Sequence, residues 1–401
     1  MKHIIVIIIS IFLALPLYSQ NEIENVLKEI ETNSTTLAAL RQQMEAQKLG
    51  NRTGIFPANP EVEFNYLWGN PSAMGNRTDF SVKQSFDFPT AYAYHGKISD
   101  LQNTNVEFAY KSERLNLLLA AKQICIELIY KNALLKEYAV RLQNAEHIAN
   151  SYKAKYENGD ANILENNKSQ LNLATVQSEI TTLETERANL LSQLKSLNGG
   201  KDIYYELLIT NYDDKSSNRN LEFVISNFED WYATAETKNP ALQYLKGKVQ
   251  IQQQEVKLQN SLWLPKFSAG YMSEKVVGQH FQGVSVGISI PLWENKNTVK
   301  QAQLAVKAQE SLLADNKLQI YNRLQNLHTK AAALQQNAQK IRQSLANYNN
   351  APLLQKALDA GEISLLEYLL ETEYYYAAIS KLLEAEREYQ LAVAELEMVE
   401  L

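Results

Sequence analysis

The sequence predicts an α+β fold in which long, coiled-coil-like helices alternate with short β-strands and the whole arrangement occurs twice. The chain is poor in turn-forming residues, with 14 Gly and 9 Pro in 401 residues, which is about half their usual share. Four long segments space their apolar residues three and four positions apart, and four short segments alternate apolar and polar residues. Few turns and long periodic segments disfavour a many-loop enzyme such as a (β/α)₈ barrel.

Residues 1–20 are typical of a secretory signal peptide. A short basic start precedes an apolar run from Ile4 to Leu15, and the segment ends in small and polar residues. We therefore expect an exported protein that is cleaved near Ser19 or Gln20. No cysteine lies near this junction, so a lipid anchor is not expected. The single cysteine, Cys125, is interpreted as a small buried hydrophobe.

The first half of the chain, residues 21–200, is predicted to contain two strands and two long helices. The predicted strands are 61–68 and 78–88, and the predicted long helices are 90–157 and 162–198.

The second half, residues 239–401, repeats this order after an equatorial or linker region at 201–238. It contains a predicted helix at 239–262, strands at 265–273 and 283–292, and long helices at 297–359 and 363–400. The loops 69–77 and 273–283 join each pair of strands into a hairpin.

The long helices carry a coiled-coil pattern. One series of apolar positions runs Leu173, Val176, Ile180, Leu183, and another runs Ile320, Leu324, Leu327, Ala331. Alternating steps of three and four give a mean period of about 3.5 residues, which is the coiled-coil repeat. These helices are therefore expected to pack side by side along their length.

The strands carry the pattern of a membrane-spanning sheet. Each has about the 9–11 residues that suit a tilted transmembrane strand, and each pairs an apolar face with a polar one. Aromatic residues near the strand ends are typical of a membrane interface: Tyr66, Trp68, Trp263, Tyr271 and Trp293. Four strands cannot close a barrel, since single-chain bacterial barrels start at about eight, so closure requires several copies. The alternative is an ordinary half-buried sheet in a soluble protein.

The two halves are related by a constant offset. Gly159 and Gly361, each at a predicted turn between long helices, are 361 − 159 = 202 residues apart. Pro89 and Pro291, each at a strand end before a long helix, are also 291 − 89 = 202 apart. The same offset at two unrelated kinds of junction indicates an internal duplication.

With these features the chain resembles the TolC family of outer-membrane efflux channels over essentially its whole mature length. The resemblance rests on the order strand, strand, helix, helix, which occurs twice, on the two Gly turns and on the tail Tyr374 to Val399. The segment Gln84 to Pro89 is similar to the strand-to-helix junction of the heavy-metal Czc/Cus-type subgroup. The resemblance implies a short N-terminal helix, which would fall within Asn21 to Leu49. The missing lipid-anchor Cys is a departure from many members.

The resemblance implies a homotrimer in the outer membrane of a Gram-negative bacterium. Three chains would form a twelve-stranded β-barrel, continued through the periplasm as a barrel of coiled-coil helices. It also implies docking onto a periplasmic adaptor (a membrane fusion protein) that serves an inner-membrane pump, as in RND efflux systems. Outer-membrane lipid would be the remaining partner.

The candidate site residues lie at and just after the two Gly turns. Glu165 and Glu367 each follow their turn glycine by six residues and would give six carboxylates in a trimer, a ring that favours cations. The resemblance adds a second acidic position, where this chain has Leu370 with Glu371 beside it. The alternative is that these glutamates are solvated helix surface. The candidate adaptor-docking tips are Gly159, Asp160, Gly361 and Glu362.

No catalytic residue set and no cofactor are expected. The five histidines are scattered, without metal-ligand spacing, and a net charge of −6 without a basic patch argues against nucleic acid. The favoured function is a passive exit duct of a tripartite efflux pump, with metal cations or small toxic molecules as substrates. The alternatives are the outer-membrane component of a type I protein secretion system and a periplasmic coiled-coil scaffold.

Overall fold

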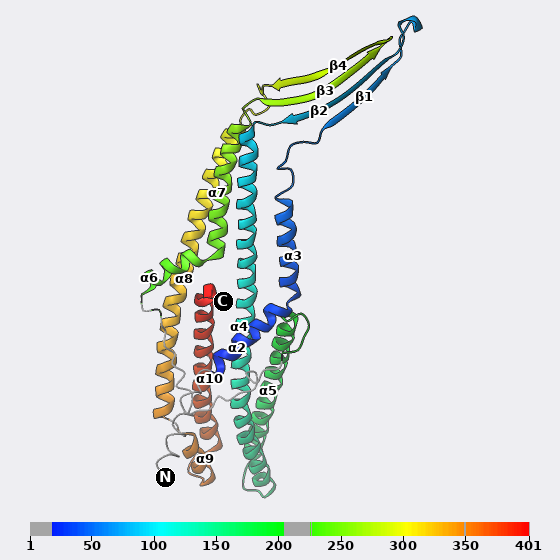
Figure 1. Cartoon of the computed structure of the whole chain (residues 1–401). Coiled ribbons are helices and arrows are strands. Elements are labelled where there is room, and N and C mark those ends of the chain that lie inside the picture. The colour runs from blue at the N-terminus through cyan, green and yellow to red at the C-terminus, as the bar shows by residue number, and fades with distance from the viewer. Residues whose placement is uncertain (1–17, 204–224, 226, 349, 401) are drawn as a thin grey trace, which may run out of the picture. The chain divides into compact units, whose positions relative to one another are not determined.

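The computed structural model describes residues 18–203, 225, 227–348 and 350–400, which form two compact units (Figure 1). The helical unit comprises Met1–Ala38, Glu113–Thr234 and Tyr321–Leu401, and the sheet unit comprises Ala39–Ser112 and Ala235–Ile320. Both halves of the chain therefore contribute to both units. The predicted signal peptide lies outside the described residues except for its last three, which begin the first helix.

The sheet unit holds all four described strands, which form a single antiparallel sheet in the order β1-β2-β3-β4. The strands are β1 (Glu61–Leu67), β2 (Arg77–Phe86), β3 (Lys266–Val276) and β4 (Gln279–Ser289), with a 3₁₀ turn η1 (Ser72–Met74) between the first two. The central pair, β2 and β3, joins the two halves of the chain. The helices of this unit are α3 (Thr35–Gly50), α7 (Pro240–Ser261) and the first parts of α4 (Pro89–Glu157) and α8 (Thr298–Asn347).

The register sorts the side chains of this sheet onto two faces. Val62, Val82, Tyr271 and Val284 lie directly opposite one another across the four strands. Because side chains alternate along a strand, every second residue from these lies on the same face. This "apolar face" also carries Phe64, Tyr66, Phe80, Phe86, Phe267, Ala269, Val286 and Ile288. The charged and small residues of the opposite "polar face" include Glu61, Glu63, Asn65, Arg77, Asp79, Ser81, Lys83, Ser85, Lys266, Ser268, Gly270, Glu274 and Ser285.

The predicted loop 273–283 is wrong, because β3 and β4 continue to a two-residue turn at Val277 and Gly278. Both turn residues have positive φ, 38° and 81°, which is the backbone of the tight hairpin turns that match strand twist. The strands run on through polar residues such as Lys275 and His280. The backbone hydrogen bonds between β3 and β4 therefore continue beyond the apolar residues. The strand ends are predicted from those apolar residues alone, so the predicted strands stop short of the turn.

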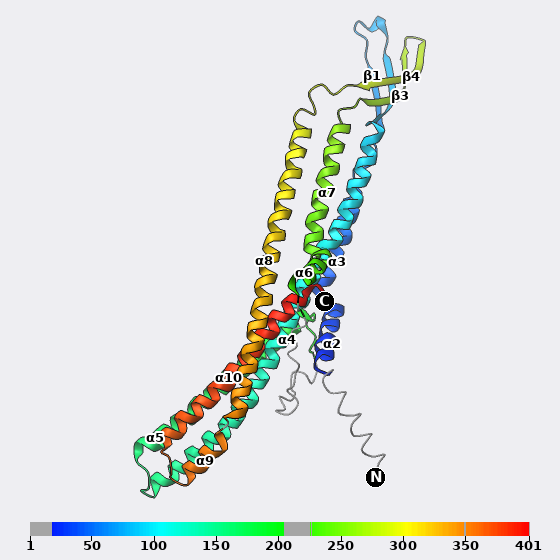
Figure 2. The ribbon, with the colours of Figure 1, turned by 90° about the vertical axis from the view of Figure 1, so that its left-hand side faces the viewer.

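The helical unit is built from long helices that pack side by side (Figures 1 and 2). It contains α2 (Tyr18–Asn33), α5 (Ile163–Leu197), α6 (Phe228–Lys238), α9 (Ala351–Asp359), α10 (Leu365–Leu396), η3 (Glu397–Glu400) and the remaining parts of α4 and α8. α4 contacts α5 through the ion pair Lys131–Glu186 at 2.6 Å, and α10 through Arg387–Glu127 at 3.6 Å. α10 contacts α8 through Lys330–Glu388 at 2.8 Å. The order of packing is α5, α4, α10, α8.

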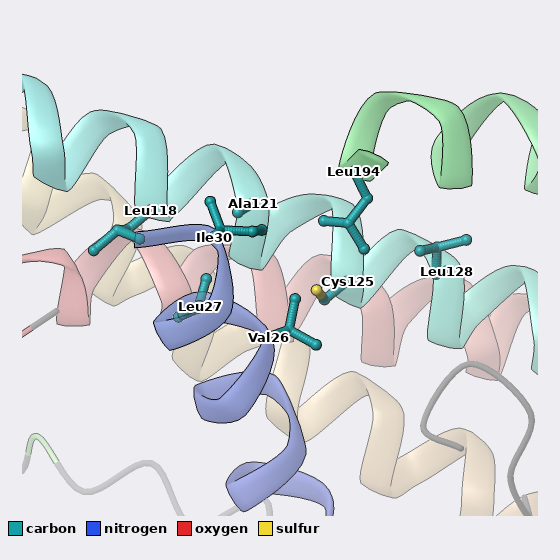
Figure 3. Packing of buried hydrophobic residues seen from close by; sticks show 8 residues of the cluster. All are labelled: Val26, Leu27, Ile30, Leu118, Ala121, Cys125, Leu128 and Leu194. Atoms are coloured by element: carbon teal, nitrogen blue, oxygen red, sulfur yellow. The ribbon is translucent and has the colours of Figure 1, made fainter. Parts of the chain in front are cut away.

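One core cluster of this unit gathers side chains from α2, α4 and α5 (Figure 3). Its buried members are Val26, Leu27, Ile30, Leu118, Ala121, Cys125, Leu128 and Leu194. Burial raises the pKa of the Cys125 thiol to about 12, so the thiol stays protonated. Cys125 is a buried hydrophobe, as the sequence indicates.

Two predicted helices are interrupted in the structure. The predicted helix 297–359 is wrong as one element, because α8 ends at Asn347 and α9 begins at Ala351, with Pro352 in its first turn. Proline has no N–H group to donate to the carbonyl four residues earlier, so it disfavours a continuous helix but is tolerated in the first turn of a new one. The predicted N-terminal helix is α2 and α3, separated at Ser34, whose Oγ accepts a hydrogen bond from the Leu37 N–H at 3.4 Å.

Among the described helices, none combines the length and the apolar character that a membrane-crossing helix needs.

Candidate functional site

The two Gly turns end their helices in the same way. At the first, the Gly159 N–H donates to the Tyr156 carbonyl at 3.1 Å and the Asp160 N–H to the Lys155 carbonyl at 2.7 Å. At the second, Gly361 donates to Leu358 at 3.1 Å and Glu362 to Ala357 at 2.9 Å. This pair of bonds is the Schellman motif, in which the glycine adopts a left-handed conformation. The φ angles of Gly159 and Gly361 are 83° and 73°.

The four predicted tip residues therefore lie in two pairs. Gly159 and Asp160 follow α4, and Gly361 and Glu362 follow α9. All four are exposed, and a Cβ atom built on either glycine meets no other atom within 4 Å. The turns thus leave Asp160 and Glu362 free to present their carboxylates to a partner.

The two predicted constriction glutamates each cap the helix that follows its turn. The Glu165 carboxylate accepts from the Asn162 N–H at 3.0 Å, and the Glu165 N–H donates to the Asn162 side chain at 3.0 Å. Glu367 and Ser364 exchange the equivalent bonds at 2.8 and 3.2 Å. Both arrangements are capping boxes, which satisfy N–H groups that a helix start leaves open. The hydrogen bond from the Ser364 backbone N–H lowers the pKa of Glu367, so the carboxylate is ionised at neutral pH.

The third predicted acidic residue, Glu371, follows Glu367 by about one helical turn on α10 and lines an open groove between α8, α9 and α10. The groove has a volume of about 570 Å³ and is lined by Lys340, Ile341, Ser344, Leu345, Tyr348, Asn350, Leu354, Glu371, Tyr374, Tyr375, Ala378 and Lys381. Within the described part of the chain, no group of three or more His, Cys, Asp or Glu side chains is arranged to hold a metal ion.

The apolar face of the sheet is open in the single chain. Val284 and Val286 are 85% and 80% exposed, and Val62 and Phe64 are exposed as well. An apolar surface of this extent in a folded protein indicates contact with lipid or another chain.

Four of the five predicted interface aromatics lie at or just beyond the strand ends. Trp68 follows β1 at the hairpin end of the sheet and contacts Tyr66 with ring centroids 5.5 Å apart. Trp263 precedes β3 and Trp293 follows β4, at the end where the helices join. Tyr271 instead lies in the middle of the apolar face, opposite Val82 and Val284.

Sequence reasoning missed a buried arginine that joins α4 to α10. The Arg141 guanidinium lies 4.4 Å from the ring centres of both Tyr138 and Tyr376. It also donates to the Tyr376 carbonyl and the Ser380 hydroxyl, each at 3.1 Å, and pairs with Glu137 at 3.5 Å. The only feature of the sequence that could have indicated this role is a charged residue next to the apolar positions of a helix. Many residues of the chain share that feature, so it does not single out Arg141.

Comparisons with known proteins place this fold. No model of a known protein family matches the chain, and no characterised protein matches it in sequence. Solved structures do match: the CmeC outer-membrane channel of Campylobacter jejuni has 15% sequence identity and a TM-score of 0.75, over 94% of this chain and 85% of CmeC. The channel protein CusC has 16% identity and a TM-score of 0.76, over 94% of this chain and 92% of CusC.

A third match is the open state of the MtrE outer-membrane channel of Neisseria gonorrhoeae, with 12% identity and a TM-score of 0.70, over 94% of this chain and 88% of MtrE. The chain therefore has the fold of the TolC-like outer-membrane channels. The predicted fold class, with long helices and four strands per chain, is confirmed.

Proposed function

We propose that three copies of this chain form an exit duct through the outer membrane of a Gram-negative bacterium. The observation that carries the proposal is the sheet, whose apolar face is uncovered and whose outer strands, β1 and β4, each keep an unpaired edge in the single chain. Lipid does not tolerate unpaired strand edges, so a spanning sheet must close on itself. With four strands per chain, three copies give twelve, a number within the range of bacterial barrels.

The sidedness of the sheet fits this proposal. The apolar face would contact lipid, and the polar face, with its carboxylates, lysine, serines and glycine, would line an aqueous pore. The likeness to the outer-membrane channels CmeC and MtrE over 94% of the chain supports the same location. The long helices would continue the pore as a tunnel in the periplasm.

The test is the state of the protein in membranes. We expect the full-length protein, expressed with its own signal, to fractionate with outer membranes and to migrate as a trimer that boiling dissociates. In a planar bilayer the purified trimer should conduct ions without an energy source. Recovery as a soluble monomer would contradict the duct and favour a periplasmic scaffold.

We further propose that the exposed turns at Asp160 and Glu362 dock a periplasmic adaptor that serves an inner-membrane pump. The two turns end their helices alike and are exposed, which suits a repeated contact with one partner. The side chains can be changed without disturbing the turns, because the Schellman bonds involve only backbone atoms.

Charge reversal tests this contact. Asp160→Lys with Glu362→Lys should leave the trimer intact, since a cation near a helix C-terminus is favourable. The double variant should show reduced cross-linking to a periplasmic adaptor that cross-links to the wild type. The matched control is Lys168→Glu on the exposed surface of α5. Unchanged cross-linking in the double variant would remove these residues from the docking surface.

A further inference from the structure

Formal charges on the strands are sorted between the two faces of the sheet. The polar face carries Glu61, Glu63, Arg77, Asp79, Lys83, Lys266 and Glu274. The apolar face carries a single formally charged residue, Lys275, directly opposite His280. The face proposed to contact lipid is therefore free of acidic residues and has one basic row.

That basic row forms a border of the apolar face. It consists of Tyr66, Thr78, Lys275 and His280, one from each strand. The next row along the same face carries Phe64 and Phe80 with Ser273, whose Oγ lies 2.8 Å from the His280 Nε2. Lys275 and His280 are exposed, and Lys275 makes no salt bridge to any described carboxylate. Its neighbour Glu274 points to the other face, where it pairs with Arg77 at 3.3 Å.

The position of the row along the strands fixes its side of the membrane. β2 leads into α4, α7 leads into β3, and β4 leads towards α8, so the helices join the sheet at one end. The row lies at the opposite end, next to the hairpin turn at Val277 and Gly278. In the proposed duct, with its helices in the periplasm, this end lies at the outer surface of the membrane.

We propose that Lys275 and His280 bind the phosphate groups of lipid headgroups in the outer leaflet. A lysine on a lipid-facing strand extends its apolar stem along the sheet and keeps its ammonium at the headgroup level. There it meets anionic phosphates, and interfacial aromatics such as Tyr66 and Trp68 accompany it. The inference rests on the proposed function, because it requires this face to lie in a membrane. In a trimer the row occurs three times around the barrel.

The test compares one lysine on each face. Trimers of the wild type, Lys275→Gln, Lys275→Gln/His280→Gln and Lys83→Gln are purified in detergent and exposed to diphosphorylated lipid A, and bound lipid is counted by native mass spectrometry. We expect several-fold less lipid A on Lys275→Gln, less still on the double variant, and wild-type retention on Lys83→Gln, which removes the same charge from the polar face. Dephosphorylated lipid A should bind equally to all four.

Three outcomes would overturn the proposal. Equal retention of lipid A by all variants would show that the basic row is not a headgroup site. Displacement of lipid A by inorganic phosphate at millimolar concentration would show a site for the free anion. A wild type that forms no membrane trimer would overturn the proposed function, and this inference with it. A variant that still forms a conducting trimer separates loss of lipid binding from loss of assembly.

Discussion

At the scale of single residues, the two turn glutamates each complete a capping box, and we predict that the same carboxylates also line a pore constriction. Glu165 and Glu367 are the third residues of their helices, and each accepts a backbone hydrogen bond from its capping partner. The hydrogen bond holds the carboxylate in place and keeps that of Glu367 ionised. A charge fixed at a helix start is well suited to a constriction, and a ring of such charges remains a prediction.

Glutamine separates the two roles, because it also completes a capping box. We expect Glu165→Gln/Glu367→Gln to change stability by less than about 1 kcal/mol and to lower the preference of the channel for cations over anions. Reversal potentials in a salt gradient across a planar bilayer measure this preference. Glu179→Gln, on the exposed surface of α5, is the control. An unchanged reversal potential in the double variant would mean that the two glutamates cap their helices and do not affect ion selectivity.

The contacts of Arg141 depend on the planar shape of its guanidinium group as well as on its charge. Its guanidinium stacks between two tyrosine rings and donates to two acceptors on α10. Lysine keeps the charge but cannot stack as a plane or donate in a fork. We expect Arg141→Lys to lower stability by about 1–2 kcal/mol, measured as the temperature at which the trimer dissociates. Arg323→Lys, at an exposed pair with Glu395, should cost much less, and equal losses would refute the stacking argument.

At the scale of elements, the helix ends at the two Gly turns are marked by both cap and turn residues in the sequence. The capping boxes begin at Asn162 and Ser364, again 364 − 162 = 202 residues apart, so cap and turn chemistry recur together. Glycine is required at these turns because a left-handed residue with a Cβ atom costs roughly 1–2 kcal/mol.

We expect Gly361→Ala to destabilise the chain by about that amount. The whole cost should be conformational, because no atom lies within 4 Å of the new methyl group. Denaturant unfolding of the purified protein measures it. Ala360→Gly, at the neighbouring helix-end position with φ −76°, serves as the comparison. An unaffected Gly361→Ala would mean that the turn changes conformation at no cost.

Element ends set by backbone geometry could not be predicted from apolar patterns. The apolar alternation of β3 and β4 stops several residues before Val277, yet the hydrogen-bond ladder does not require apolar side chains. The break before α9 leaves the apolar spacing of α8 almost unchanged, and Pro352 was its only signal. Likewise, the two N-terminal helices share one apolar pattern across Ser34.

At the scale of the whole molecule, periodicity identified the faces of helices and strands but not their partners. The residues that join α4 to α10, such as Arg141 and Tyr376, lie 235 positions apart, and nothing local marks them as neighbours. The sheet could be foreseen as two hairpins, whereas the pairing of β2 with β3 became visible only in the structure.

Membrane insertion should depend on which face of β4 is changed. Val286 lies on the apolar face and is 80% exposed in the single chain, and its neighbour Ser285 lies on the polar face. We expect Val286→Lys to cost about 2–4 kcal/mol near the middle of the bilayer and to reduce the yield of heat-modifiable trimer. Ser285→Lys should be tolerated. Equal yields from the two variants would contradict contact between the apolar face and lipid.

The central strand pair also bears on how the chain reaches its final state. Arg77 on β2 pairs with Val276 on β3, and these residues are 276 − 77 = 199 positions apart, whereas α4 and α5 meet through a turn of a few residues. Contacts between distant parts of a chain form slowly, because a large loop must close first. We therefore expect an early intermediate with formed helical hairpins and two separate strand hairpins. In such an intermediate the apolar face is divided between two hairpins, so the continuous apolar face of the sheet forms only when β2 pairs with β3.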